Sequence, residues 1–197
     1  TNGDGNLSVQ ESRAIKQVTF DKNSNISSLE GIDNLLSLEK IVISDLKLDS
    51  LKGIENCTNV NYVFIKGCDI ENYSALKNLK NKLQYLYFHN INDAELEKVC
   101  SITTGIGNCD FENLQYFAVA GNIDYISDLS TPSFTSRGSS VQTSKSAKTI
   151  TSIIPLKNLS EKTKNNIKYL SLNNNNITSI EGISEFNNLF MLRLEYN

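Results

Sequence analysis

The sequence predicts a β-rich α/β solenoid, in which short repeated units stack their strands into one parallel sheet. Two segments resemble each other, IKQVTFDKNSNISSLEGIDNLLSL from Ile15 and IKYLSLNNNNITSIEGISEFNNL from Ile167. A pair of apolar residues separated by one residue recurs seven times, with spacings of 23, 22, 23, 31, 53 and 22 residues. Because such a unit buries its apolar face only against its neighbours, this period indicates a stacked array.

The first element is a polar loop that leads into a helix. The first eleven residues, TNGDGNLSVQE, fit the twelve-residue EF-hand calcium loop if its first position lies one residue before Thr1. The predicted oxygen ligands are Asn2, Asp4, Asn6 (through its carbonyl), Ser8 and Glu11. The following VQESRAI predicts a helix that caps the repeat core, so residues 1–16 form an EF-hand-like loop and capping helix. The alternative is a polar turn with no metal.

Residues 17–197 are predicted to form the repeats, with about seven parallel strands. Alternation along a strand points the members of each apolar pair toward the core. The predicted inward pairs are Val18/Phe20, Ile41/Ile43, Val63/Ile65, Leu86/Phe88, Phe117/Val119, Leu170/Leu172 and Leu192/Leu194.

A polar ladder is expected five residues after the first member of each pair. An inward amide at that position would bond the turn backbone of the adjacent unit. The position holds Asn23, Leu46, Cys68, Ile91, Asn122, Asn175 and Asn197. The rest of each unit returns along the convex side in extended or 3-10 form, because 22 residues leave no room for a long helix.

Two units carry insertions. The stretch NDAELEKVCSITTGIGNC is longer, and its Leu96 and Val99 lie at helical spacing, which predicts a convex helix. A second insertion at about 127–152 is rich in Ser and Thr, with 13 of them in residues 130–152. Its SFTSRGSSV segment suits a hairpin around Arg137-Gly138, and an irregular loop is the alternative.

The repeated pattern L-x-x-L-x-L-x-x-N-x-I-x-x-I-x-x-L is that of leucine-rich repeats, and its 22-residue period resembles the class found in bacterial internalin-like surface proteins. This resemblance implies a curved, right-handed solenoid with a concave sheet that binds another protein. The N-terminal loop resembles the single calcium loops of dockerins and of bacterial secreted proteins. Together these resemblances imply a secreted or cell-surface location. The loop lacks its first position and the last residue, Asn197, stands at a ladder position, so the chain is expected to be a fragment of a longer protein.

The four cysteines show no metal-binding spacing, and there is only one histidine. Cys57 and Cys68 fall at buried repeat positions, where free thiols are expected. Cys100 and Cys109 flank a loop and would allow a disulfide, which spacing alone does not establish.

The partner-binding site is predicted on the outward residues of the strands. Tyr62, Tyr85, Tyr116 and Tyr169 precede four consecutive inward pairs, and alternation points them all to the concave face. The predicted site is an exposed aromatic strip with two neighbouring basic side chains: Tyr62, Phe64, Lys66, Tyr85, Tyr87, His89, Tyr116 and Tyr169. Stacking that only stabilises the sheet is the alternative.

The predicted function is a non-catalytic protein-interaction module. With 19 Lys and Arg against 22 Asp and Glu, the chain has no electrostatic footprint for nucleic acid. No apolar run is long enough to cross a membrane, and no nucleophile–base pattern or phosphate-binding glycine loop is present. The expected partner is a protein, and the only expected cofactor is weakly bound Ca²⁺. The alternatives are a cytoplasmic scaffold or regulatory subunit, and the targeting region of a larger enzyme.

Overall fold

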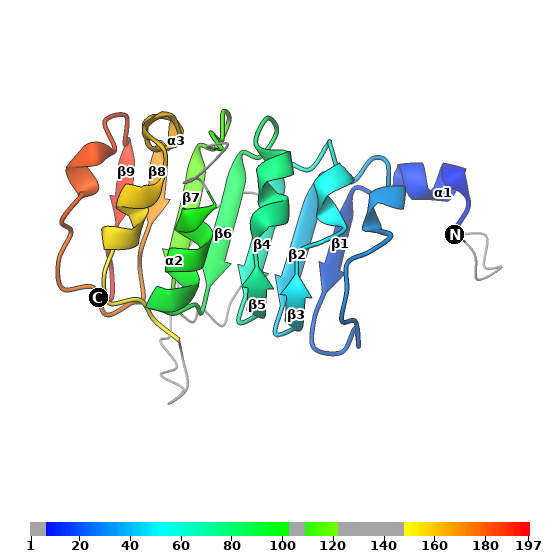
Figure 1. Ribbon diagram of the computed structural model, residues 1–197, viewed down its shortest axis with the longest axis horizontal. Coiled ribbons are helices and arrows are strands. Elements are labelled where there is room, and N and C mark those ends of the chain that lie inside the picture. Colours follow the sequence, from blue (N-terminus) through cyan, green and yellow to red (C-terminus); the bar gives the residue numbers. More distant parts are fainter. Residues whose placement is uncertain (1–6, 103–108, 122–147) are drawn as a thin grey trace.

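The computed structural model describes residues 7–102, 109–121 and 148–197. Seven parallel strands lie side by side in one sheet, and each hydrogen-bonds to the strand of the next unit (Figure 1). They are β1 (Gln17–Phe20), β2 (Lys40–Ser44), β4 (Tyr62–Lys66), β6 (Tyr85–His89), β7 (Tyr116–Ala120), β8 (Tyr169–Ser171) and β9 (Met191–Arg193). The predicted solenoid and its seven strands are confirmed.

The convex side is built from short elements, as the period requires. Two four-residue strands, β3 (Lys47–Ser50) and β5 (Asp69–Asn72), pair in parallel in a small second sheet, which the sequence did not predict. Five 3-10 turns are described on the convex side, and two of them follow β3 and β5 in the same units. These are η1 (Ile32–Asn34), η2 (Ile54–Asn56), η3 (Ser74–Leu79), η4 (Ile154–Asn158) and η5 (Ile183–Glu185).

Three helices are described. The helix α1 (Val9–Ala14) lies beside β1 at one end of the stack, and α2 (Asp93–Ser101) is the predicted helix of the first insertion (Figure 1). A third, α3 (Glu161–Asn166), was not predicted. The α2 helix begins with a capping box, in which the Asn92 side chain accepts from the Glu95 N–H and the Glu95 carboxylate accepts from the Asn92 N–H.

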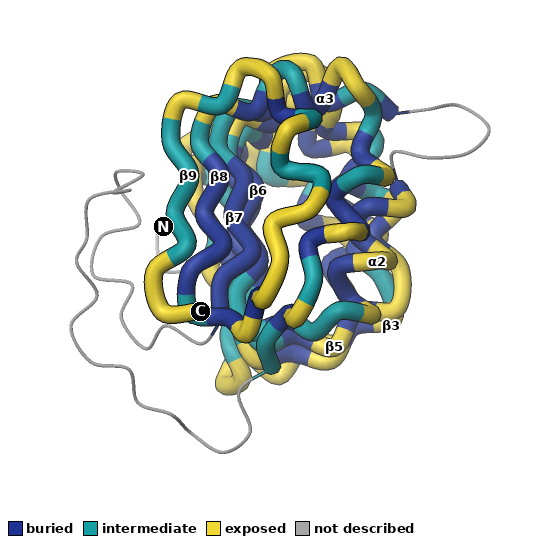
Figure 2. Tube along the Cα trace, turned by 90° about the vertical axis from the view of Figure 1, so that its left-hand side faces the viewer, coloured by how far each residue is buried: buried dark blue, intermediate teal, exposed yellow. Residues whose placement is uncertain are grey.

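The core lies between the sheet and the convex elements. Figure 2 looks along the stack and shows the sheet as one wall and β3, β5 and α2 as the other, with buried segments facing inward. The inward pairs of the five units from β2 to β8 are buried in one continuous cluster, while the pairs of β1 and β9, at the two ends of the sheet, are only partly buried. This distribution is expected of a solenoid, because each unit is covered by its neighbours.

The polar ladder forms at some of its predicted positions. The Asn175 amide donates to the carbonyls of Val119 (2.8 Å) and Leu172 (3.0 Å). Asn197 repeats this arrangement in the next unit, and Asn122 lies outside the described residues. The prediction is wrong for Asn23, which is exposed and bonds the nearby Asp21 carboxylate.

The end of the second insertion belongs to the repeat. The Ile150 N–H donates to the Asn175 Oδ1 at 3.1 Å, just as the Ile177 N–H donates to the Asn197 Oδ1. Ile150 is fully buried, so residues 148–152 are not part of a projecting loop. The predicted hairpin and the rest of the insertion lie outside the described residues.

The same segment is attached to α2 by polar contacts. The Asp93 carboxylate accepts from the Thr151 N–H (2.8 Å) and hydroxyl (2.7 Å), and the Lys148 ammonium pairs with Glu95 at 2.7 Å. The C-terminal end of the second insertion therefore lies on the convex side, where it contacts α2, the helix of the first insertion.

All four cysteines are free and buried, which confirms the expectation for Cys57 and Cys68. The disulfide considered for Cys100 and Cys109 is not formed. Burial raises the pKa of the Cys57 and Cys68 thiols to about 11, with a smaller contribution from nearby carboxylates. Both thiols are therefore protonated at neutral pH.

Candidate functional site

The candidate site is the concave face, which is the side of the large sheet turned away from the core. The ladder register aligns Tyr62, Tyr85, Tyr116 and Tyr169 directly across four adjacent strands. The same register pairs Phe64 with Tyr87 and Lys66 with His89. All eight residues predicted from the sequence are therefore brought together on one face.

The four aligned tyrosines form a continuous column. Tyr116 stacks on Tyr169 with ring centroids 4.4 Å apart and an interplanar angle of 4°, and Tyr85 stacks on Tyr116 at 4.6 Å. The column continues to Tyr62, 5.7 Å from Tyr85. We call Tyr62, Tyr85, Tyr116 and Tyr169 the tyrosine column. The three stacked rings, Tyr85, Tyr116 and Tyr169, cover one another's faces and present their edges.

Two residues at the ends of the column were not selected from the sequence. The Lys40 ammonium lies 4.2 Å from the centroid of the Tyr62 ring, within the range of a cation–π interaction. At the other end, Phe190 packs edge-on against Tyr169 at 5.6 Å and is highly exposed. The sequence pattern could have identified Lys40 as part of this surface, because Lys40 aligns with Tyr62 of the next strand. Phe190 does not align with the tyrosines, because it directly precedes Met191, the residue opposite Tyr169.

The expected exposure of the strip is wrong for three of its members. Tyr62, Phe64 and Tyr87 retain only 9%, 2% and 8% of their exposed surface, and they pack with Val42 and Ala118 in a second apolar cluster. Tyr85 and Tyr116 pack against that cluster and are only partly buried. The accessible aromatic surface is therefore Tyr85, Tyr116 and Tyr169, supported from beside by the buried rings.

His89 is held neutral beside this cluster. Its ring lies 4.8 Å from Phe64 in an edge contact, and its Nδ1 is buried with no hydrogen-bond partner. Burial, and to a smaller extent the Lys66 charge, lowers the pKa of His89 to about 3. The imidazole is thus unprotonated at physiological pH.

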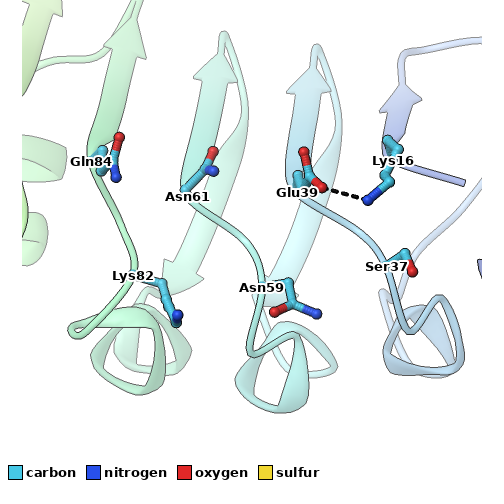
Figure 3. Close-up of a pocket in the computed structure, with 7 residues that line it drawn as sticks. All are labelled: Lys16, Ser37, Glu39, Asn59, Asn61, Lys82 and Gln84. Atoms are coloured by element: carbon cyan, nitrogen blue, oxygen red, sulfur yellow. Dashed lines mark hydrogen bonds and ion pairs between the residues drawn. The ribbon is translucent and has the colours of Figure 1, made fainter.

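A shallow polar groove of about 370 Å³ runs beside the column, along the edge where β1, β2, β4 and β6 begin (Figure 3). The Lys16 and Glu39 side chains in it form an ion pair. Its lining residues are Lys16, Ser37, Glu39, Asn59, Asn61, Lys82 and Gln84. Asn61 and Gln84 directly precede Tyr62 and Tyr85, so amide groups border the aromatic surface.

Among residues 7–102, 109–121 and 148–197, no group of three or more His, Cys, Asp or Glu side chains could hold a metal ion. In the same part of the chain, no helix has both the length and the apolar character needed to cross a bilayer. Of the predicted calcium ligands, Asn2, Asp4 and Asn6 lie outside the described residues.

The two described members of the calcium loop form a capping box at the start of α1. The Glu11 carboxylate accepts from the Ser8 N–H (3.0 Å) and hydroxyl (2.7 Å), and the Glu11 N–H donates to the Ser8 Oγ (3.2 Å). This arrangement stabilises the helix N-terminus without a metal. Calcium binding stays a prediction.

Thermal melting distinguishes a calcium-binding loop from a loop that only caps the helix. If the loop binds calcium, several millimolar Ca²⁺ raises the melting temperature by mass action, since a ligand of the folded state stabilises it. Asp4→Ala removes a predicted ligand that takes no part in the capping box, so the variant is expected to keep the metal-free melting temperature and lose the calcium response. Equal melting curves of the unchanged protein with Ca²⁺ and with a chelator would show that the loop is only a cap.

No family model and no curated protein sequence matches the chain. Among solved structures it is similar to an internalin (inlF) from Listeria monocytogenes, at 18% identity and a TM-score of 0.51, over 94% of this chain and 49% of that one. An internalin C2 (inlC2) from the same organism aligns at 17% identity and a TM-score of 0.46, over 95% and 84% of the two chains. The chain thus spans about half the length of the inlF chain. The parallel seven-stranded sheet, the short convex elements and this likeness show that the chain is folded as a leucine-rich repeat solenoid of the kind found in internalins.

Proposed function

We propose that this chain is a non-catalytic module that binds a protein partner through its concave face. The tyrosine column carries the proposal, because partly exposed Tyr85, Tyr116 and Tyr169 form one aromatic surface across adjacent strands. Tyrosine is enriched at the energetically important positions of protein interfaces, where its rigid ring buries a large area at low entropic cost.

The stacking geometry favours a protein over a sugar. Carbohydrate recognition by aromatic residues uses open ring faces, and the stacked rings of Tyr85, Tyr116 and Tyr169 cover each other at 4.6 and 4.4 Å. The ring edges instead offer contacts to apolar side chains, and the bordering amides of Asn61 and Gln84 offer hydrogen bonds to a peptide backbone.

A secreted or cell-surface location is part of the proposal, supported by the likeness in fold to internalins. An intracellular scaffold is the alternative, and the free, buried cysteines are compatible with either location. No role in catalysis is proposed, since the thiols of Cys57 and Cys68 are protonated and His89 is neutral and buried at Nδ1.

The function is tested by selecting binders from a random peptide library displayed on phage. Tyr116→Ala with Tyr169→Ala removes two stacked rings, and we expect the selected peptides to bind this variant at least about tenfold more weakly, as for the loss of interface hot spots. Ile154→Ala is the matched control, because Ile154 is a 53% exposed apolar side chain on the convex side.

Both variants are first compared by thermal melting, so that loss of folding is separated from loss of binding. The single variant Tyr169→Phe keeps the stacked ring and removes only a hydroxyl group, and it is expected to bind nearly as the unchanged protein does. Peptides that bind the tyrosine variant normally and lose affinity for Ile154→Ala would place the interaction surface on the convex side and refute the proposal.

A further inference from the structure

The polar groove lies between two rows of side chains that cross the sheet where its strands begin (Figure 3). Members of the first row stand two residues before the first inward residue of their strands, and members of the second row stand four residues before it. The first row is Lys16, Glu39, Asn61 and Gln84, and the second row is Ser37, Asn59 and Lys82. Because neighbouring strands contribute the successive members of each row, the groove runs across the strands, as the tyrosine column does.

The two ends of the groove differ in charge. At the β1 end, the Lys16 ammonium and the Glu39 carboxylate form an ion pair and neutralise each other. At the β6 end stands Lys82, which is exposed and whose ammonium forms no ion pair or hydrogen bond with another residue of the described chain. The units before and after it hold Asn59 and Asn113 at the same position, and their amides donate to carbonyls of the preceding units at 3.0 and 2.6 Å. Lys82 therefore interrupts a row of amides and leaves a positive charge at one end of the groove.

The middle of the groove holds two side-chain amides, those of Asn61 and Gln84. Neither amide hydrogen-bonds to another residue of the described chain. A side-chain amide has a carbonyl acceptor and an NH₂ donor, so it matches the N–H and C=O of a peptide bond. Gln115 holds the same position before Tyr116 in the next unit. With strands about 4.8 Å apart, these three positions span about 10 Å, which equals about three residues of an extended chain.

The hydrogen bonds that such a row can form depend on the conformation of the ligand. Inside a helix, the backbone N–H and C=O groups bond to each other, and only the helix ends offer them to a neighbour. An extended segment outside a sheet has no such internal bonds, and its peptide groups need partners wherever water is excluded. A row of amides therefore adds affinity for an extended segment and adds little for a helix.

We propose that the partner places an extended peptide segment in the polar groove, with its backbone bonded to the amides of Asn61 and Gln84 and an Asp or Glu side chain facing Lys82. Opposite charge at Lys82 fixes the register of the segment, since such complementarity chiefly sets association rate and choice of partner. The segment lies beside the tyrosine column, because Gln84 directly precedes the accessible Tyr85. This inference names the form in which the partner of the proposed function is bound, and it rests on that function.

The backbone contacts are tested with the peptides selected above that lose affinity for the tyrosine variant. Asn61→Ala with Gln84→Ala is expected to weaken these peptides at least about tenfold, because each substitution removes a donor and an acceptor. Asn78→Ala is the matched control, since Asn78 is an exposed amide in the convex turn η3. Thermal melting first shows that the variants fold, and Gln84→Ala alone, at an exposed position, serves if the double variant is unstable.

Methylation of the peptide nitrogens, one at a time, removes backbone donors without changing any side chain of the ligand. We expect at least one position at which N-methylation costs about tenfold in affinity for the unchanged protein and clearly less for Gln84→Ala, where the partner group is already absent. Such a difference between the two proteins measures direct coupling between the peptide bond and Gln84.

The charge at Lys82 is tested by Lys82→Gln, which keeps a polar side chain. This variant is expected to bind the peptides about threefold more weakly at low salt and equally at about 0.5 M salt, because the ion pair is exposed and screened. Lys47→Gln, with the same change of net charge on the convex strand β3, should leave binding unaffected.

Three results would overturn the inference and leave the proposed function intact. They are tighter binding of the tyrosine-dependent peptides once a lactam between positions i and i+4 holds them helical, normal binding to the amide variant, and normal binding to Lys82→Gln at low salt. If no selected peptide depends on the tyrosines, the inference and the proposed function both fall.

Discussion

Replacing Gly53 by alanine is expected to lower the free energy of unfolding by about 3 kcal/mol. Two effects add at this position. The backbone of Gly53 has a φ of 112°, which side chains other than glycine rarely adopt, and this conformation costs an alanine about 1–2 kcal/mol. A Cβ would also collide with the Leu29 carbonyl and lie 2.9 Å from the Glu30 nitrogen, both backbone groups of the preceding unit. Such overpacking typically costs about 1–3 kcal/mol.

Gly31 provides the matched control. It occupies the same place in its own unit, directly before a 3-10 turn, and its φ of 91° is similar. The nearest neighbour of a Cβ there is the Asn34 amide nitrogen at 3.8 Å, which is an ordinary contact. Gly31→Ala should therefore cost only the conformational part, about 1 kcal/mol. Denaturant unfolding of both variants measures the difference. Equal losses of unfolding free energy in the two variants would mean that the backbone of the preceding unit makes room for the new Cβ at position 53 at no cost.

The repeat period predicts the sheet because it is a global signal. Seven apolar pairs define the strands, and the observed register, from Gln17 opposite Lys40 to Tyr169 opposite Met191, follows from aligning them. The helix α2 is predictable for the same reason, since Leu96 and Val99 break the strand period with a helical one. Patterns that repeat, or that interrupt a repeat, are visible in one sequence.

The exposure of the candidate site is not predictable in this way. Alternation correctly assigns Tyr62, Phe64 and Tyr87 to the concave face. A residue on that face is, however, not necessarily exposed to solvent. Large rings on adjacent strands, about 4.8 Å apart, bury one another. The Tyr62 and Tyr87 rings lie 5.3 Å apart in an edge contact. The buried rings therefore form an apolar cluster against which Tyr85 and Tyr116 pack.

A second asparagine ladder shows a signal that was present and missed. Four residues before the first inward residue of their strands, Asn59, Asn113 and Asn188 each donate to a carbonyl of the preceding unit, at 3.0, 2.6 and 2.8 Å. Asn166 does the same at 3.0 Å. Aligning the units on their inward pairs places these residues in one column. Asn23, in contrast, forms no ladder contact with a neighbouring strand. The reason is that β1 is the first strand of the sheet, so no earlier strand offers a carbonyl to the Asn23 amide.

Asn175→Ala is expected to destabilise the protein by about 3 kcal/mol. The Asn175 side chain is only 4% exposed. Its amide nitrogen donates to the Val119 and Leu172 carbonyls, and its oxygen accepts from the Ile150 N–H. Alanine leaves these buried groups without partners, and each unsatisfied group costs about 1–3 kcal/mol. Relaxation of the backbone and entry of water recover part of that sum.

The loss should be local as well as global, because Asn175 joins three separate parts of the chain. It links β7, β8 and the segment that begins at Ile150, so amide hydrogen exchange at Ile150 is expected to accelerate more than exchange in β2 or β4. Asn23→Ala is the control at the equivalent repeat position, and as an exposed residue it should change stability by less than about 0.5 kcal/mol. If both substitutions cost the same, or if Ile150 stays protected in Asn175→Ala, then the carbonyls of the neighbouring units do not depend on this amide.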